Sequence, residues 1–173
     1  MSYKKGLSQV VSTVLLILLS VAFVGGIFYT VRTYVETGIE SSDSCSNIIE
    51  KVNINSEYTC YDSASRSVVI SIARSEISMD SLLVSIYSDE DGNSKIFSLS
   101  NKQEEIDGVS NYGSGGAEVS MVSLPGNESG KTYCVSGFPS APTRIEIAPK
   151  IGGVQCSVVD TVGEIKGCVN LGC

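Results

Sequence analysis

The segment Leu7–Val31, LSQVVSTVLLILLSVAFVGGIFYTV, contains no charged residue and decides the fold class of the chain. A helix of about 25 residues is about 37 Å long, and the hydrocarbon core of a bilayer is about 30 Å thick. The segment is therefore predicted to form a helix that can cross a membrane. Gly25-Gly26 lowers the local helix propensity, so a bend or partial melting is expected there.

The charges that flank this segment predict its orientation. Lys4 and Lys5 precede it, whereas Glu36, Glu40 and Asp43 lie beyond it. Cytoplasmic flanks of membrane helices carry the excess of Lys and Arg. The N-terminus is thus predicted to lie in the cytoplasm and the rest of the chain outside.

Three interpretations of the helix compete. A secretory signal has an apolar stretch of about 7 to 15 residues and a small-x-small cleavage site, and this segment is longer and has no clear site of that kind. A plain membrane anchor fits both length and charge. In the third interpretation, a cut beside Gly6, at the cytoplasmic edge, removes a short basic leader and keeps the whole helix.

Residues 4–16, KKGLSQVVSTVLL, resemble the class III signal peptide and helix start of archaeal type IV pilins. The resemblance implies that a prepilin peptidase recognises Lys4 and Lys5 and cuts between Gly6 and Leu7. Bacterial pilins usually carry Glu five residues into the mature chain, where this sequence has Val11, so the archaeal kind is favoured. The related archaellins have a glycine-rich helix start, which is not seen here.

Small residues recur along the predicted helix at four-residue spacing. This spacing places them on one side of the helix, where a neighbouring helix can approach closely, although small residues are also common in membrane helices in general. The predicted packing positions are Ser8, Ser12, Ala22, Gly26 and Thr30.

Beyond Ser44 the apolar pattern changes to the period of two that is typical of strands. Strands are predicted at 67–72, 82–87, 95–97, 118–122, 132–135 and 144–147, with turns at 89–93, 125–127 and 152–153. The polar, glycine-rich residues 101–116 are predicted to form a long mobile loop. The pattern indicates an antiparallel β-sandwich, immunoglobulin-like in architecture, and hence an α+β fold.

The cysteines are Cys45, Cys60, Cys134, Cys156, Cys168 and Cys173, all beyond the apolar segment. The chain has no His to complete a zinc site, so disulfides are the better prediction, and these persist outside the cell. Six cysteines allow fifteen pairings. A small C-terminal loop closed by Cys168 and Cys173 is expected, with the other four tying the helix-proximal segment to the strands.

Composition weighs against several function classes. The formal net charge of -7 disfavours nucleic-acid binding, and the lack of His removes the commonest general base. Asp89, Asp91 and Asn93 alternate as in calcium loops, but Gly92 comes too early for that pattern. No enzyme activity, cofactor or metal is expected. Asn127, in the triplet Asn-Glu-Ser, is a candidate N-glycosylation site.

The expected organisation has three parts: a leader (1–6), an apolar to amphipathic helix (7–42) and an extracellular domain (43–173). The leading hypothesis is a homopolymeric filament subunit that is inserted in the membrane as a precursor, cut by prepilin peptidase and added by pilus assembly machinery. The alternative is a membrane-tethered extracellular binding module that is neither cut nor polymerised.

Overall fold

A computed structural model describes residues 4–46, 48, 50–88, 92–113, 121–169 and 173. The chain divides into two compact units, Met1–Ser42 and Asp43–Cys173. The division falls where the sequence changes from an apolar run to alternating strands. The fold is α+β: one long apolar helix followed by a domain of mainly antiparallel strands.

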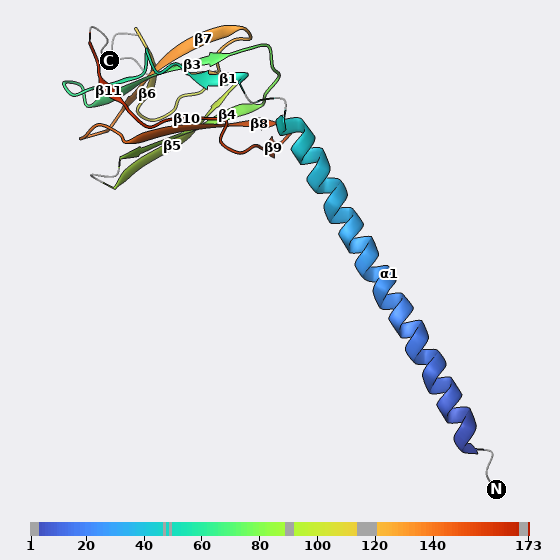
Figure 1. The fold of residues 1–173 in the computed structure, drawn as a ribbon. Helices are drawn as coiled ribbons and strands as arrows, with labels where there is room; N and C mark the ends of the chain where they lie inside the picture. The colour runs from blue at the N-terminus through green and yellow to red at the C-terminus, as the bar shows by residue number, and fades with distance from the viewer. Residues whose placement is uncertain (1–3, 47, 49, 89–91, 114–120, 170–172) are drawn as a thin grey trace. The chain divides into compact units, whose positions relative to one another are not determined.

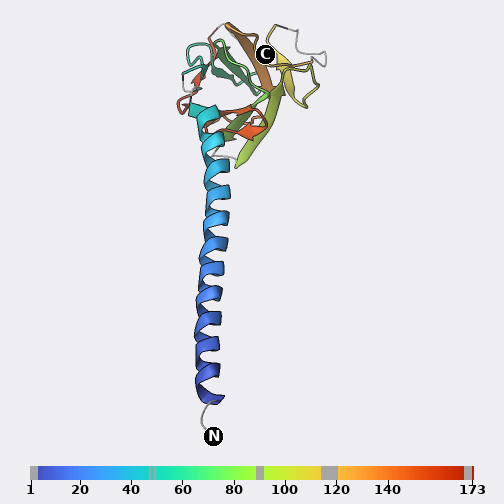
Figure 2. The ribbon, with the colours of Figure 1, turned by 90° about the vertical axis from the view of Figure 1, so that its right-hand side faces the viewer.

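The helix α1 (Lys4–Ser46) is continuous (Figures 1 and 2). Its backbone bonds are satisfied within the segment, which is the requirement for any single segment surrounded by lipid. The backbone is helical through Gly25 and Gly26 without a break, so the alternative of partial melting there is not found. Each glycine weakens the helix by about 1 kcal/mol relative to Ala, and the long apolar runs on either side outweigh that local loss.

The second unit contains short and long strands in two sheets (Figure 1). They are β1 (Val52–Ile54), β2 (Cys60–Asp62), β3 (Ser67–Arg74), β4 (Ser81–Ser88), β5 (Asn93–Ser100), β6 (Val109–Asn111), β7 (Ser129–Ser136), β8 (Arg144–Ile151), β9 (Val154–Gln155), β10 (Asp160–Val162) and β11 (Lys166–Gly167). Sheet A has the order β11-β2-β3-β7-β6, with β1 also paired to β3. Sheet B has the order β10-β8-β4-β5, with β9 paired to β8.

Long antiparallel ladders hold each sheet together. In sheet A, β3 pairs with β7 from Ser67↔Ser136 to Arg74↔Ser129. In sheet B, β4 pairs along its length with β5 and β8. The short strand β11 runs parallel to β2, so the prediction of a wholly antiparallel domain is wrong at this edge. A disulfide joins Cys60 of β2 to Cys168, which directly follows β11, and holds the two strands together.

One hydrophobic core is shared by the two sheets. Alternate residues of β3 and β7, such as Ile70 and Val135, face the same cluster as Val84 and Ile147 of sheet B. All four side chains are at most 1% exposed. The period of two seen in the sequence is therefore the period at which side chains enter this core.

Hydrogen bonds close both sides of the domain, directly between the sheets on one side and through residues 122–124 on the other. On one side the backbone N–H of Ile54 in β1 donates to Oδ2 of Asp160 in β10, at 2.7 Å. On the other side Leu124 donates its N–H to the carbonyl of Ser100 at 2.8 Å, and Val122 forms a bridge with Glu104. Residues 122–124 are thus bonded to the end of β5, and Val122 and Leu124 are buried in the core between the sheets.

The predicted strands at 67–72, 82–87, 95–97, 132–135 and 144–147 lie within β3, β4, β5, β7 and β8. Residues 118–120 of the strand predicted at 118–122 and residues 89–91 of the turn predicted at 89–93 lie outside the described residues. The turn at Gly152-Gly153 joins β8 to β9, and both glycines have positive φ, as a two-residue hairpin of this type requires.

The prediction of one long loop at 101–116 is wrong in part, because β6 lies within it. Gly108 has φ +64°, and a side chain at this position would meet Lys95 Nζ and Ser136 Oγ. Glycine is favoured here because this φ is strained for a residue with a side chain, and a Cβ would also require Lys95 and Ser136 to move. The glycine that suggests a flexible loop in the sequence instead allows Ile106 to bridge to Val109 and β6 to join β7.

Tyr133 is the buried polar anchor of the side closed by residues 122–124. Its side chain is 1% exposed, and its hydroxyl donates to the carbonyl of Ser123 at 2.7 Å. Burial raises the pKa of Tyr133, because the phenolate would lose its hydration.

The raised pKa gives the domain a pH dependence of known sign. The contribution of Tyr133 to the free energy of unfolding is complete below the unfolded-state pKa of about 10 and is lost as pH rises toward the folded-state pKa. Tyr133→Phe should therefore be less stable than wild type by about 0.5 to 1.5 kcal/mol at pH 7, and this gap should shrink above pH 10. Denaturant unfolding of both proteins in detergent across pH 7 to 11 measures it. A gap that stays constant or widens with pH contradicts the assignment.

Candidate functional site

The apolar surface of α1 is the most conspicuous functional feature of the described residues. From Val10 to Val35 the helix is long and apolar enough to cross a membrane, and none of this 26-residue span is buried within the chain. Its large apolar side chains are each between 49% and 79% exposed. Covering one such side chain contributes about 1.5 to 3 kcal/mol, so an aqueous environment for this surface is strongly unfavourable.

Several hydroxyl side chains in the span are satisfied within the helix. Thr13 donates its hydroxyl to the carbonyl of Val10, and Ser20 donates to Ile17. Thr30 donates to the carbonyls of Gly26 and Ile27, at 3.0 and 2.9 Å. These hydroxyls therefore carry no unmet hydrogen bond into an apolar environment.

The predicted packing positions Ala22, Gly26 and Thr30 lie along one shallow depression of the helix surface. Its rims are formed by larger side chains, and its lining residues are Leu19, Ala22, Phe23, Gly26, Ile27 and Thr30. A Cβ added at Gly26 would meet nothing within 4 Å, so the space is open. The geometry permits the close approach of a second helix, and no such helix is part of the described chain.

The predicted leader positions lie at the start of α1. Lys4, Lys5, Gly6, Leu7 and Ser8 all have helical backbone, and their side chains are outside the described set. Ser12, the other predicted packing position, lies one turn further along. Acidic residues stabilise the positive N-terminal end of a helix dipole, and the first turn has none. The positive charges of Lys4 and Lys5 are unfavourable at this end of the helix. Their presence fits a role in orientation or recognition better than one in helix stability.

All six cysteines are joined in three disulfides: Cys45–Cys156, Cys60–Cys168 and Cys134–Cys173. The expected C-terminal loop closed by Cys168 and Cys173 is therefore wrong. Each of these cysteines instead bonds to a strand of sheet A, since β11 lies along β2. The expectation that the other cysteines tie the helix-proximal segment to the strands fits Cys45, in the last turn of α1, whose partner directly follows β9.

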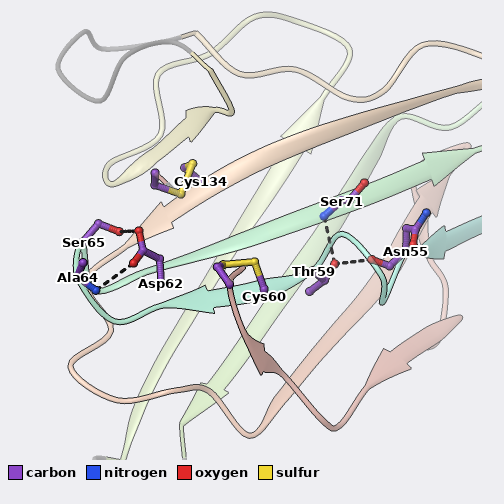
Figure 3. The surroundings of a disulfide bond; sticks show 10 residues. Asn55, Thr59, Cys60, Asp62, Ala64, Ser65, Ser71 and Cys134 are labelled. Atoms are coloured by element: carbon purple, nitrogen blue, oxygen red, sulfur yellow. Dashed lines mark hydrogen bonds between the residues drawn. A yellow bond between two sulfur atoms is a disulfide. The ribbon is translucent and has the colours of Figure 1, made fainter. Parts of the chain in front are cut away.

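Two of the disulfides fasten the C-terminal residues to the outer face of sheet A (Figure 3). Cys60, Val69 and Cys134 lie opposite one another on three neighbouring strands. Their chain neighbours Tyr61 and Val68 belong to the core, so this row faces away from it. Val69 is nevertheless 0% exposed. The disulfides to Cys168 and Cys173 therefore flank a second, small buried site on the outer face.

Asp62 supports the turn next to this row (Figure 3). Its carboxylate accepts hydrogen bonds from the Ser65 hydroxyl at 2.8 Å and the Ala64 N–H at 2.9 Å. These bonds, with that of Ser65 the largest cause, lower the pKa of Asp62. Asp62 therefore has a structural role, which is to stabilise the turn between β2 and β3.

No group of three or more His, Cys, Asp or Glu side chains that could hold a metal occurs among the described residues. The buried polar groups have structural roles. Arg74, 7% exposed, donates to the backbone carbonyls of Ile77 and Pro125. Burial lowers the pKa of Lys95, and Asp107 partly opposes that shift. Neither cation lies beside a nucleophile with a base.

Asn127, the predicted glycosylation site, is exposed in the turn before β7. It lies seven residues before Cys134 in the sequence. The candidate functional surface is the apolar surface of α1.

Comparison with models of known protein families, with curated proteins and with solved structures gave no match to this chain. Its function is therefore inferred from its own residues and geometry.

The sequence interpretation missed two features of the site. One is the burial of Val69 on the outer face of sheet A, between Cys60 and Cys134; the apolar pair Val68-Val69 was the available signal, because one of two adjacent strand residues must leave the core. The other is the buried cation Arg74, which ends a strand of apolar residues. A charged residue at the end of an apolar strand indicates that its side chain bonds to backbone carbonyls of the neighbouring loops, as Arg74 does with Ile77 and Pro125.

The disulfide pairing predicts an unambiguous tryptic pattern without reduction. Residues 167–173 contain both Cys168 and Cys173, so the pairing should join this peptide to 52–66 and to 132–144 in one linked species. A second species should join 33–51 to 151–166 through Cys45 and Cys156. Mass spectrometry identifies both. A free 167–173 peptide with an internal disulfide would restore the small C-terminal loop and contradict the structure.

Proposed function

We propose that the chain is a structural subunit of an extracellular filament of the type IV pilus kind. Its precursor resides in the membrane, its leader is cut between Gly6 and Leu7, and the released subunit polymerises with copies of itself through α1. The extracellular domain coats the filament. No side chain is required to perform chemistry in this role.

The observation that carries the proposal is the uncovered apolar surface of Val10–Val35 on a chain whose second unit is a complete disulfide-bonded domain. A surface of this length is stable either in lipid or among other apolar helices. The same surface therefore serves the precursor in the bilayer and the subunit in a filament core. The helix depression at Gly26 supports close packing between copies.

Two further features support the location and architecture of the proposal. Disulfides persist in oxidising surroundings, which supports an extracellular second unit. The shared core of sheets A and B supports an immunoglobulin-like β-sandwich as its architecture, with the parallel β11 as a departure.

The alternative, a tethered binding module, needs a ligand site on the second unit. A polar depression there, of about 640 Å³, is lined by residues that include Asp160. Asp160 already accepts hydrogen bonds from the N–H groups of Ile54 and Thr161. Its carboxylate thus closes the side of the domain, and this role favours a structural reading of the depression.

Replacing Gly6 by Leu should block maturation, because a peptidase that cuts beside this residue needs a small side chain there. The variant and wild type are coexpressed with a prepilin peptidase, and the N-terminus of each product is sequenced. Gly25→Leu is the matched control, since it adds the same side chain at a glycine within the span and should be cut normally. A Gly6→Leu product that begins at Leu7 would refute the cleavage assignment.

The depression on α1 predicts different effects of two adjacent glycines on assembly. Neither Gly25 nor Gly26 has an atom within 4 Å of an added Cβ, and Leu raises helix propensity by a similar amount at both. Gly26→Leu fills the depression and should abolish filaments, whereas Gly25→Leu, about 100° around the helix, should retain them. Electron microscopy of cells that lack the native protein measures the outcome. Normal filaments from Gly26→Leu would exclude this packing surface, and membrane-bound monomers from wild type would favour the tethered module.

A further inference from the structure

The turn between Leu124 and β7 presents a free asparagine to solvent. Residues 126–130 are all exposed, and Asn127 has no hydrogen bond with any described residue. Among the asparagines of the chain, only Asn127 is followed two positions later by Ser or Thr. The exposed turn thus coincides with the single acceptor triplet for N-linked sugars.

The base of this turn is fixed while its tip is free. Arg74 Nη1 donates to the carbonyl of Pro125 at 3.0 Å, and the β3–β7 ladder ends with the pair Arg74↔Ser129. Glu128, with φ +52°, reverses the chain between these two fixed points. Asn127 therefore projects from a clamped turn, and a large group attached to it would displace no part of the core.

The surface beside the turn has room for a polar group. A depression of about 410 Å³ is lined by Ala73, Arg74, Ser75, Glu128, Ser129 and Gly130. The hydroxyl of Ser129 makes only a long bond, of 3.4 Å, to the carbonyl of Gly130. Hydroxyl, carboxylate and backbone groups suit a sugar, which is both a donor and an acceptor at many positions.

We propose that Asn127 carries an N-linked glycan whose first sugars lie over this depression. The donor is a lipid-linked glycosyl phosphate at the outer face of the membrane. The amide nitrogen of Asn127 forms a bond to the anomeric carbon of the sugar, the bond from that carbon to the phosphate oxygen breaks, and the lipid phosphate leaves with the electron pair. The amide proton passes to a base of the transferase, and no oxidation or reduction takes place.

The proposal stands independently of filament assembly, because it requires only export of the second unit. It adds a constraint to assembly, however. A glycan at Asn127 marks the turn as a surface that no neighbouring subunit covers.

Mass spectrometry of the full chain, purified from the cells that naturally produce it and digested with trypsin, tests the proposal. The peptide 103–131 should be heavier than its sequence mass by a whole number of sugar residues. Asn127→Gln and Ser129→Ala should each lose the added mass completely. Ser129→Thr keeps the acceptor triplet and should retain it.

Each outcome is decisive. A wild-type peptide of unmodified mass overturns the proposal, as does added mass that persists in Asn127→Gln. The two disulfide-linked tryptic species described above show that each variant is folded, so loss of the sugar is separated from loss of the domain. A variant that lacks these species is replaced by Asn127→Asp, which changes the acceptor amide alone.

Discussion

The apolar side chains of α1 between Val10 and Val35 have to be removed from water, and they are not covered within their own chain. The hydrophobic effect acts on this surface in proportion to its area, with no requirement for direction. Lipid and a bundle of like helices satisfy it equally well. In the proposed filament, the small residues at Ala22 and Gly26 favour packing between helices, because dispersion contacts grow as helix backbones come closer.

The second unit is a small domain, and its stability depends on its core and on its three disulfides. Its core is built from single side chains at alternating positions of two sheets, and several of its strands have only two or three residues. Short strands have few ladder bonds, so the disulfides hold them in place: β11 is joined to β2 through Cys168 and Cys60. Cross-links of this kind act largely by limiting the unfolded chain, and more so for long loops.

The sequence predicted α1 and the long strands well, because both depend on a local period of apolar residues. It also predicted that the cysteines pair, since that depends on composition. The partners of Cys168 and Cys173 depend on the parallel course of β11 along β2, a contact between residues about a hundred positions apart, which no local pattern encodes. Strand β6 was missed for a related reason: Gly108 signals freedom in isolation, whereas in the fold it meets a steric demand from Lys95 and Ser136. Both errors concern long-range contacts.

The bridge between Cys45 and Cys156 also sets how far the subunit can lengthen under tension. A pull applied through α1 reaches Cys45 and passes directly to Cys156, a position 111 residues further along the chain. From there the covalent path to Cys173 is 17 residues (173 minus 156), or about 60 Å when fully extended, against about 430 Å for the 128 residues from Cys45 (173 minus 45) without the bridge. The strands between β1 and β9 lie outside this path. Under tension between α1 and Cys173, β1 to β9 therefore carry no load until the Cys45–Cys156 disulfide is reduced.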